Sequence, residues 1–108
     1  MYRKTAIGLS FGACVFLAVL AVADEPAGAK VDGEKIFQTY CYQCHGTGFA
    51  GAPIAREKQD WERRVAAGMD AMLKNARQGL NAMPPMGTCA QCSDAELQAA
   101  IAQMLQFD

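Results

Sequence analysis

Cys41-Tyr42-Gln43-Cys44-His45 is the stretch that most constrains this chain of 108 residues. Two thiols and an imidazole in a C-x-x-C-H pattern are the groups that covalent attachment of a c-type haem requires. The thiols add to the two haem vinyl groups as thioethers, and the adjacent histidine reaches the iron as its proximal ligand. Cys41 and Cys44 lie about one helical turn apart, so both sulfurs can reach one porphyrin edge. We therefore predict covalent haem on Cys41 and Cys44, with His45 on the iron.

The same cysteine spacing also occurs in zinc sites, thioredoxin-like redox pairs and structural disulfides. A second pair at Cys89-Ala90-Gln91-Cys92 makes a four-thiolate zinc site an alternative. However, 44 residues separate the two pairs, whereas a compact zinc ribbon has roughly 15 to 20 intervening residues. The surroundings also lack the βαβ pattern expected of a thioredoxin-like protein, so haem attachment is the favoured interpretation.

Residues 1–23 have the pattern of a secretory signal peptide. Arg3 and Lys4 precede an apolar run from Ala6 to Val22, which ends in the small-x-small sequence Ala21-Val22-Ala23. Cleavage at this sequence predicts export to the periplasm. An uncleaved membrane anchor is the alternative, because the run is close to the minimum span of about 17 residues.

Cleavage would remove Cys14 and leave four cysteines in an oxidising compartment. We expect residues 24–31 to be a flexible lead-in and residues 32–108 to form one small domain. The exported chain would hold 8 basic and 11 acidic residues, a formal net charge of −3. This charge is too mild and too mixed to indicate nucleic-acid binding.

Apolar residues at helical spacing predict an all-α domain, because no segment alternates convincingly as a strand. The expected helices begin at Asp32, Asp60 and about Asp70, and after a Ser93-Asp94-Ala95-Glu96 capping box. We expect the first helix to run to about Tyr42 and the third to stop before Gly79.

The second iron ligand has to be something other than histidine, because His45 is the only histidine in the chain. Methionine is the usual partner in cytochromes c. Met83 is our first choice, since it follows a helix stop and precedes Pro84 and Pro85, which stiffen the loop. Met86 is the alternative. If neither methionine bound the iron, a five-coordinate haem could bind small ligands or carry out peroxidase-like chemistry.

The motifs together resemble those of a class I cytochrome c, in particular the cytochrome c-five group. The residues that carry this resemblance are Gly33-Glu34-Lys35-Ile36-Phe37, the haem motif, Trp61, Met83-Pro84-Pro85, Gly87-Thr88-Cys89 and Cys92-Ser93-Asp94-Ala95-Glu96-Leu97. The resemblance covers about residues 32 to 107 and implies roughly four helices around one covalently attached haem. It also implies axial ligation by His45 and Met83, a disulfide between Cys89 and Cys92, Trp61 near the haem propionates, and terminal helices that cross near Gly33 and Phe37.

The expected function is one-electron transfer, because an iron with two strong axial ligands has no open position for oxygen, peroxide or substrate. We expect an exported monohaem carrier, rather than an enzyme, that docks transiently with other redox proteins. Weak redox encounters of this kind use small interfaces, typically under about 1,200 Å². We further expect a monomer that binds no nucleic acid and is not inserted in a membrane after signal cleavage.

Overall fold

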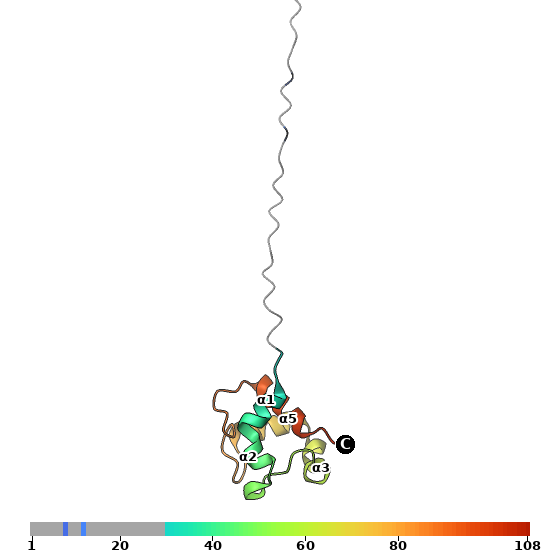
Figure 1. Ribbon diagram of the computed structural model, residues 1–108, viewed down its shortest axis with the longest axis vertical. Helices are drawn as coiled ribbons and strands as arrows, with labels where there is room; N and C mark the ends of the chain where they lie inside the picture. Colours follow the sequence, from blue (N-terminus) through green and yellow to red (C-terminus); the bar gives the residue numbers. More distant parts are fainter. Residues whose placement is uncertain (1–7, 9–11, 13–29) are drawn as a thin grey trace, which may run out of the picture.

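The computed structural model of the protein describes residues 8, 12 and 30–108 (Figure 1). Apart from Gly8 and Gly12, the expected signal peptide lies outside the described residues, as does most of the expected lead-in. The elements in chain order are α1 (Gly33–Ile36), a π-helical segment η1 (Phe37–Cys41), α2 (Tyr42–His45), a 3-10 turn η2 (Phe49–Gly51), α3 (Lys58–Ala67), α4 (Met69–Gln78) and α5 (Asp94–Met104).

These elements make an all-α fold, as the sequence predicted. Segments α1, η1 and α2 follow one another without interruption, so the described residues contain four main helices. Within residues 30–108 there is no β-strand, only an isolated antiparallel bridge between Leu80 and Met83. No helix in the described part of the chain combines the length and the apolar character needed to cross a membrane.

The first helix begins as expected but ends later than expected. The Asp32 carboxylate accepts a hydrogen bond from the backbone N–H of Lys35 at 3.0 Å, which is the geometry of an N-cap. The expected end near Tyr42 is wrong, because the helical backbone continues to His45 and stops at Gly46. The haem motif therefore lies on the last helical turns, and only the glycine-rich segment after it forms a loop.

Helices α1 and α5 cross in close contact near Gly33, as the resemblance implied (Figure 1). Gly33 is buried, and a Cβ atom added there would collide with the carbonyl group of Ala99 on α5. Helix α5 starts with the expected capping box, in which Ser93 and Glu96 each accept a hydrogen bond from the other's backbone N–H. A side-chain-free residue at the crossing lets the two terminal helices pack backbone to backbone.

The expected cap of the second main helix is wrong. Helix α3 begins at Lys58, and Asp60 lies inside its first turn. The Asp60 carboxylate instead accepts a hydrogen bond from the backbone N–H of Ile54 at 2.8 Å, and so ties the loop after the haem motif to α3. The extent of the third helix is confirmed, since α4 ends at Gln78 and Gly79 follows with a φ of +81°.

Two apolar clusters hold the helices together. The buried residues of the larger one, called the main cluster, are Phe37, Trp61, Met72, Ala76, Ala100, Ile101 and Met104. The smaller one, called the disulfide cluster, consists of Cys89, Cys92 and Leu97. Helix α5 contributes to both, so the two clusters are continuous through it.

Candidate haem site

The two cysteines of the haem motif are free thiols at the end of the first helix. Cys41 closes the π-helical segment η1 and Cys44 lies on α2, and both are partly buried. Burial, followed by the negative charge of a nearby Cys44 thiolate, raises the pKa of the Cys41 thiol to about 11. The Cys41 thiol therefore stays protonated at neutral pH. Conversion of the Cys41 thiol to a thioether would leave no ionisable group in this partly buried position.

His45 is buried, and its ring is held from one side. Its Nδ1 lies 2.9 Å from the carbonyl oxygen of Pro53. A carbonyl can only accept, so in the neutral ring Nδ1 carries the hydrogen and Nε2 keeps a free lone pair. The backbone carbonyl of His45 also accepts a hydrogen bond from the N–H of Ala55 at 2.6 Å. The segment that follows the haem motif thus folds back and fixes His45 with Nε2 available to a metal.

Trp61 lies beside this histidine in the main cluster. Its ring centroid is 6.0 Å from that of His45. Its indole N–H donates to the carbonyl oxygen of Ile54 at 2.7 Å, so the polar atom of this buried ring has a partner in the protein. The carbonyls of consecutive residues Pro53 and Ile54 therefore orient the two rings. The sequence did not predict these two carbonyl contacts, because every residue has a backbone carbonyl, whatever its side chain.

The loop that carries Met83 is fixed by backbone hydrogen bonds. Leu80 and Met83 exchange two such bonds, of 3.1 Å and 2.9 Å. The N–H of Met86 donates to the carbonyl of Ala76 on α4 at 2.7 Å, which ties the far side of the loop to that helix. Gly79 fits tightly under this loop, since an added Cβ would lie 2.8 Å from the carbonyl oxygen of Met83. The Met83 backbone therefore has little freedom to move.

The two candidate methionines face different surroundings. Both are partly buried. Met83 packs against the main cluster, as does Cys41 of the haem motif. Met86 packs against the disulfide cluster and lines a surface hollow on α4. Only Met83 thus shares its apolar surroundings with a haem-motif cysteine.

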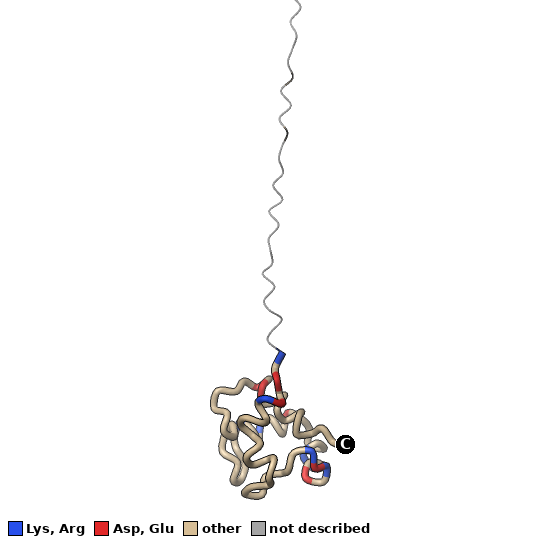
Figure 2. Tube along the Cα trace, in the orientation of Figure 1, with Lys and Arg blue, Asp and Glu red and all other residues tan. Residues whose placement is uncertain are grey.

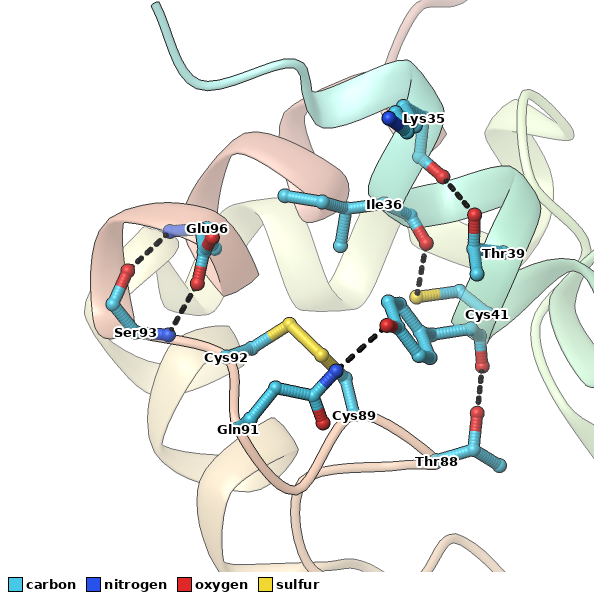
Figure 3. The surroundings of a disulfide bond; sticks show 11 residues. Lys35, Ile36, Thr39, Cys41, Thr88, Cys89, Gln91, Cys92, Ser93 and Glu96 are labelled. Carbon is cyan, nitrogen blue, oxygen red and sulfur yellow. Dashed lines mark hydrogen bonds between the residues drawn. A yellow bond between two sulfur atoms is a disulfide. The ribbon is translucent and has the colours of Figure 1, made fainter. Parts of the chain in front are cut away.

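The second cysteine pair forms a disulfide directly before α5 (Figure 3). The Cα atoms of Cys89 and Cys92 are 5.4 Å apart, and both residues are buried. This pair offers no thiolates to zinc. Among the described residues there is also no group of three or more histidine, cysteine, aspartate or glutamate side chains arranged to hold a metal ion.

Tyr40 connects this disulfide loop to the haem-motif helix. The Thr88 hydroxyl donates to the backbone carbonyl of Tyr40 at 2.6 Å. The Gln91 amide donates to the Tyr40 hydroxyl, also at 2.6 Å (Figure 3). The sequence singled out none of these three residues for this role, because two polar contacts across about 50 positions produce no periodic pattern.

Comparison with known proteins identifies the family. The family model described as "Cytochrome C oxidase, cbb3-type, subunit III" matches residues 28–104. Cytochrome c5 of Azotobacter vinelandii is 47% identical over 79 residues, which cover 71% of this chain and 95% of that protein. The chain belongs to the c5 group of class I c-type cytochromes.

Solved structures of similar cytochromes agree with this assignment. A mono-haem ferrocytochrome c from Shewanella putrefaciens has a TM-score of 0.65 and 44% identity, covering 71% of this chain and 95% of that one. A cytochrome c solved in an electron-transfer complex with nitrite reductase has a TM-score of 0.64 and 41% identity, covering 68% and 89% of the two chains. This c5-type cytochrome accordingly carries one covalently bound haem c and is a monohaem electron carrier.

The residues of this cytochrome fit that cofactor. Two free thiols stand one helical turn apart, and a buried imidazole with Nε2 unengaged follows them directly. A thioether side chain on a fixed loop packs against the same cluster as Cys41. These are the donor types that covalent attachment and two-sided iron ligation need.

Proposed function

We propose that Cys41 and Cys44 hold the haem as thioethers, and that His45 and Met83 bind its iron from opposite sides. The observation that carries this proposal is the packing of Met83 against the cluster that also contacts Cys41, whereas Met86 packs elsewhere. Haem bound in this way supplies a one-electron iron(III)/iron(II) couple.

Protein groups around the iron would set the reduction potential of that couple. The hydrogen bond from Nδ1 of His45 to the Pro53 carbonyl fixes the ring orientation and makes Nε2 a better donor. The soft sulfur of Met83 favours the reduced iron and so raises the reduction potential. With both ligands bound, no coordination position remains for oxygen or peroxide. This ligand set therefore supports an electron carrier over the five-coordinate alternative.

We also propose that the protein is exported and works in the periplasm as a monomer. The signal-peptide pattern of residues 1–23 supports export, and an oxidising compartment is compatible with the disulfide between Cys89 and Cys92. The similar cytochrome c found in complex with nitrite reductase supports redox enzymes as the class of partner. Docking would be brief, since a carrier has to leave one partner to reach the next.

The matched variants Met83→Ala and Met86→Ala test the ligand assignment. We expect Met83→Ala, made alongside haem-attachment machinery, to keep its covalent haem. It should lose the long-wavelength sulfur-to-iron band of the oxidised protein and have a lower potential, because water would replace the thioether. Met86→Ala should keep both the band and the potential. The reverse pattern would assign the iron to Met86.

Carbon monoxide separates the carrier from the five-coordinate alternative. The reduced wild-type protein at neutral pH should keep its low-spin spectrum under carbon monoxide, because both axial positions are filled. A spectrum that shifts on addition of the gas would instead indicate an open iron. Haem that resists extraction with acidified acetone would support the two thioethers, and a colourless exported protein would contradict the whole proposal.

A further inference from the structure

One peptide unit lies between the imidazole of His45 and the carboxylate of Asp60. Its carbonyl oxygen, which belongs to Pro53, lies 2.9 Å from Nδ1 of His45. Its N–H, which belongs to Ile54, donates to Oδ2 of Asp60 at 2.8 Å. The peptide is trans, so its carbonyl and its N–H point in opposite directions within one plane. The three groups therefore form a continuous hydrogen-bonded chain from imidazole through peptide to carboxylate.

Neighbouring hydrogen bonds hold this peptide unit in place. The carbonyl of Ile54 accepts the indole N–H of Trp61 at 2.7 Å. The N–H of Ala55 donates to the backbone carbonyl of His45 at 2.6 Å. Asp60 is itself partly buried in the first turn of α3. The peptide is thus fixed on one side to the haem-motif helix and on the other side to α3.

The Asp60 carboxylate is a charged acceptor for this hydrogen bond. Neither of the two ion pairs between described residues includes Asp60. Arg64, one turn further along α3, donates to the backbone carbonyl of Asp60. A negative charge is favourable in the first turn of a helix, because the free N–H groups there point toward it. Hydrogen bonds to a charged acceptor are stronger than those between neutral groups.

We propose that Asp60 is a positioning residue that lowers the reduction potential of the iron, acting through the Pro53–Ile54 peptide and His45. This inference rests on the proposed function, because it takes His45 as an iron ligand. Hydrogen bonds in a chain polarise one another, so a negative acceptor at the N–H makes the carbonyl oxygen at the other end more negative. That oxygen attracts the Nδ1 proton more strongly and makes Nε2 a better donor, which favours iron(III) over iron(II).

Three variants separate the charge of Asp60 from its geometry. Asp60→Asn removes the charge but keeps an oxygen that can accept the Ile54 N–H. Asp60→Ala removes both, and leaves that N–H without its acceptor. Helix α3 carries acidic and basic positions close together (Figure 2). Glu62→Gln is the matched control, because it removes one negative charge from an exposed position two residues further along the same helix.

Redox titration of the holoproteins measures the effect. Asp60→Asn should shift the equilibrium constant for reduction at least about threefold toward the reduced protein, or about 28 mV at about 59 mV per tenfold change. Glu62→Gln should shift it less than about 1.5-fold, because water and salt screen an exposed charge. Both variants should keep the sulfur-to-iron band.

NMR spectra of the reduced holoproteins report on the chain itself. The signals of the His45 Nδ1 proton and the Ile54 amide proton should both move upfield in Asp60→Asn, since weaker hydrogen bonds deshield their protons less. They should stay in place in Glu62→Gln. Asp60→Ala should melt below Asp60→Asn, because the Ile54 N–H has lost its acceptor. In the wild type, scalar coupling across the hydrogen bond should join the Ile54 amide nitrogen to the Asp60 carboxyl carbon.

Several results would overturn the proposal. Equal shifts of potential in Asp60→Asn and Glu62→Gln would mean that the charge acts only through space. An unchanged Nδ1 signal in Asp60→Asn would mean that the peptide does not transmit its effect. Absence of the scalar coupling would remove the hydrogen bond on which the chain depends, even if a variant failed to fold. A haem without His45 on its iron, which the wild-type spectra reveal beforehand, overturns the proposed function as well. A normally ligated haem with an unchanged potential in Asp60→Asn overturns only the role of Asp60.

Discussion

Gly79 is the residue on which the position of the Met83 loop depends most directly. It ends α4 with φ +81° and ψ 156°, a region of backbone conformation that is essentially restricted to glycine. In Gly79→Ala the new Cβ would also lie 2.8 Å from the carbonyl oxygen of Met83 and 2.9 Å from the nitrogen of Pro85. The loop would have to move, because ordinary contacts begin at about 3.4 Å. We predict that this variant is less stable than the wild type and that the bond proposed between Met83 and the iron is weaker in it.

Gly68 provides a matched control. It ends α3 with φ +96° and ψ 164°, nearly the same backbone conformation. Apart from Gly68 itself and its two neighbours in the chain, no heavy atom of the described residues lies within 4 Å of the Cβ position. Gly68→Ala should therefore show the backbone strain alone, about 1–3 kcal/mol. Gly79→Ala adds a crowding cost of about 1–3 kcal/mol, for a total of about 2–6 kcal/mol.

Thermal unfolding of the two oxidised holoproteins measures the difference. At about 4–8 °C per kcal/mol for a domain of this size, Gly79→Ala should melt at least about 4 °C below Gly68→Ala. The sulfur-to-iron band should be intact in Gly68→Ala. In Gly79→Ala it should be weaker and should disappear at a lower temperature than the helix signal. Equal melting points and identical bands in the two variants would refute the argument that contact with Gly79 positions the Met83 loop.

Further variants test two features outside the haem site, the disulfide before α5 and the close contact between α1 and α5. In Cys89→Ala with Cys92→Ala, the loss of a disulfide that closes a very short loop should cost about 2 kcal/mol, seen in guanidinium unfolding, while the haem and its spectrum are retained. Loss of haem incorporation would contradict the separate roles given to the two cysteine pairs. Gly33→Ala should cost about 1–3 kcal/mol through collision with the Ala99 carbonyl. Adding Ala99→Gly should restore little stability, because it removes a methyl group and leaves that carbonyl in place.

The sequence predicted most of the local structure because the relevant signals were local. The capping box before α5 and the stop at Gly79 each depend on residues within one turn, and both are present in the structure. The all-α class followed from periodicity, whereas the crossing of α1 with α5 near Gly33 came from the family resemblance and not from a local signal. Cys41, Cys44 and His45 could be singled out because their chemistry requires a fixed spacing.

The errors came where contacts that form only in the folded protein override local preference. Asp60 is of a residue type that often caps the start of a helix. Its carboxylate instead accepts a hydrogen bond from the N–H of Ile54, which comes within reach only once the loop has folded. The π-helical segment η1 adds a residue to one turn of the first helix, so residues at helical spacing do not all face the same apolar cluster. Phe37 and Cys41 pack in the main cluster, whereas Tyr40 packs against the disulfide cluster. Periodicity alone does not reveal such a shift.

The packing of the first helix against both clusters suits a small domain that has to hold the thioether ligand proposed for the iron. A protein of this size has a small core, so a loop needs specific restraints to keep one geometry. The first helix contacts the main cluster through Cys41 and the disulfide cluster through Tyr40, and the Met83 loop is joined to the same two clusters. The haem-motif helix and the Met83 loop, which carry the proposed iron ligands, are thus held by the same two apolar clusters.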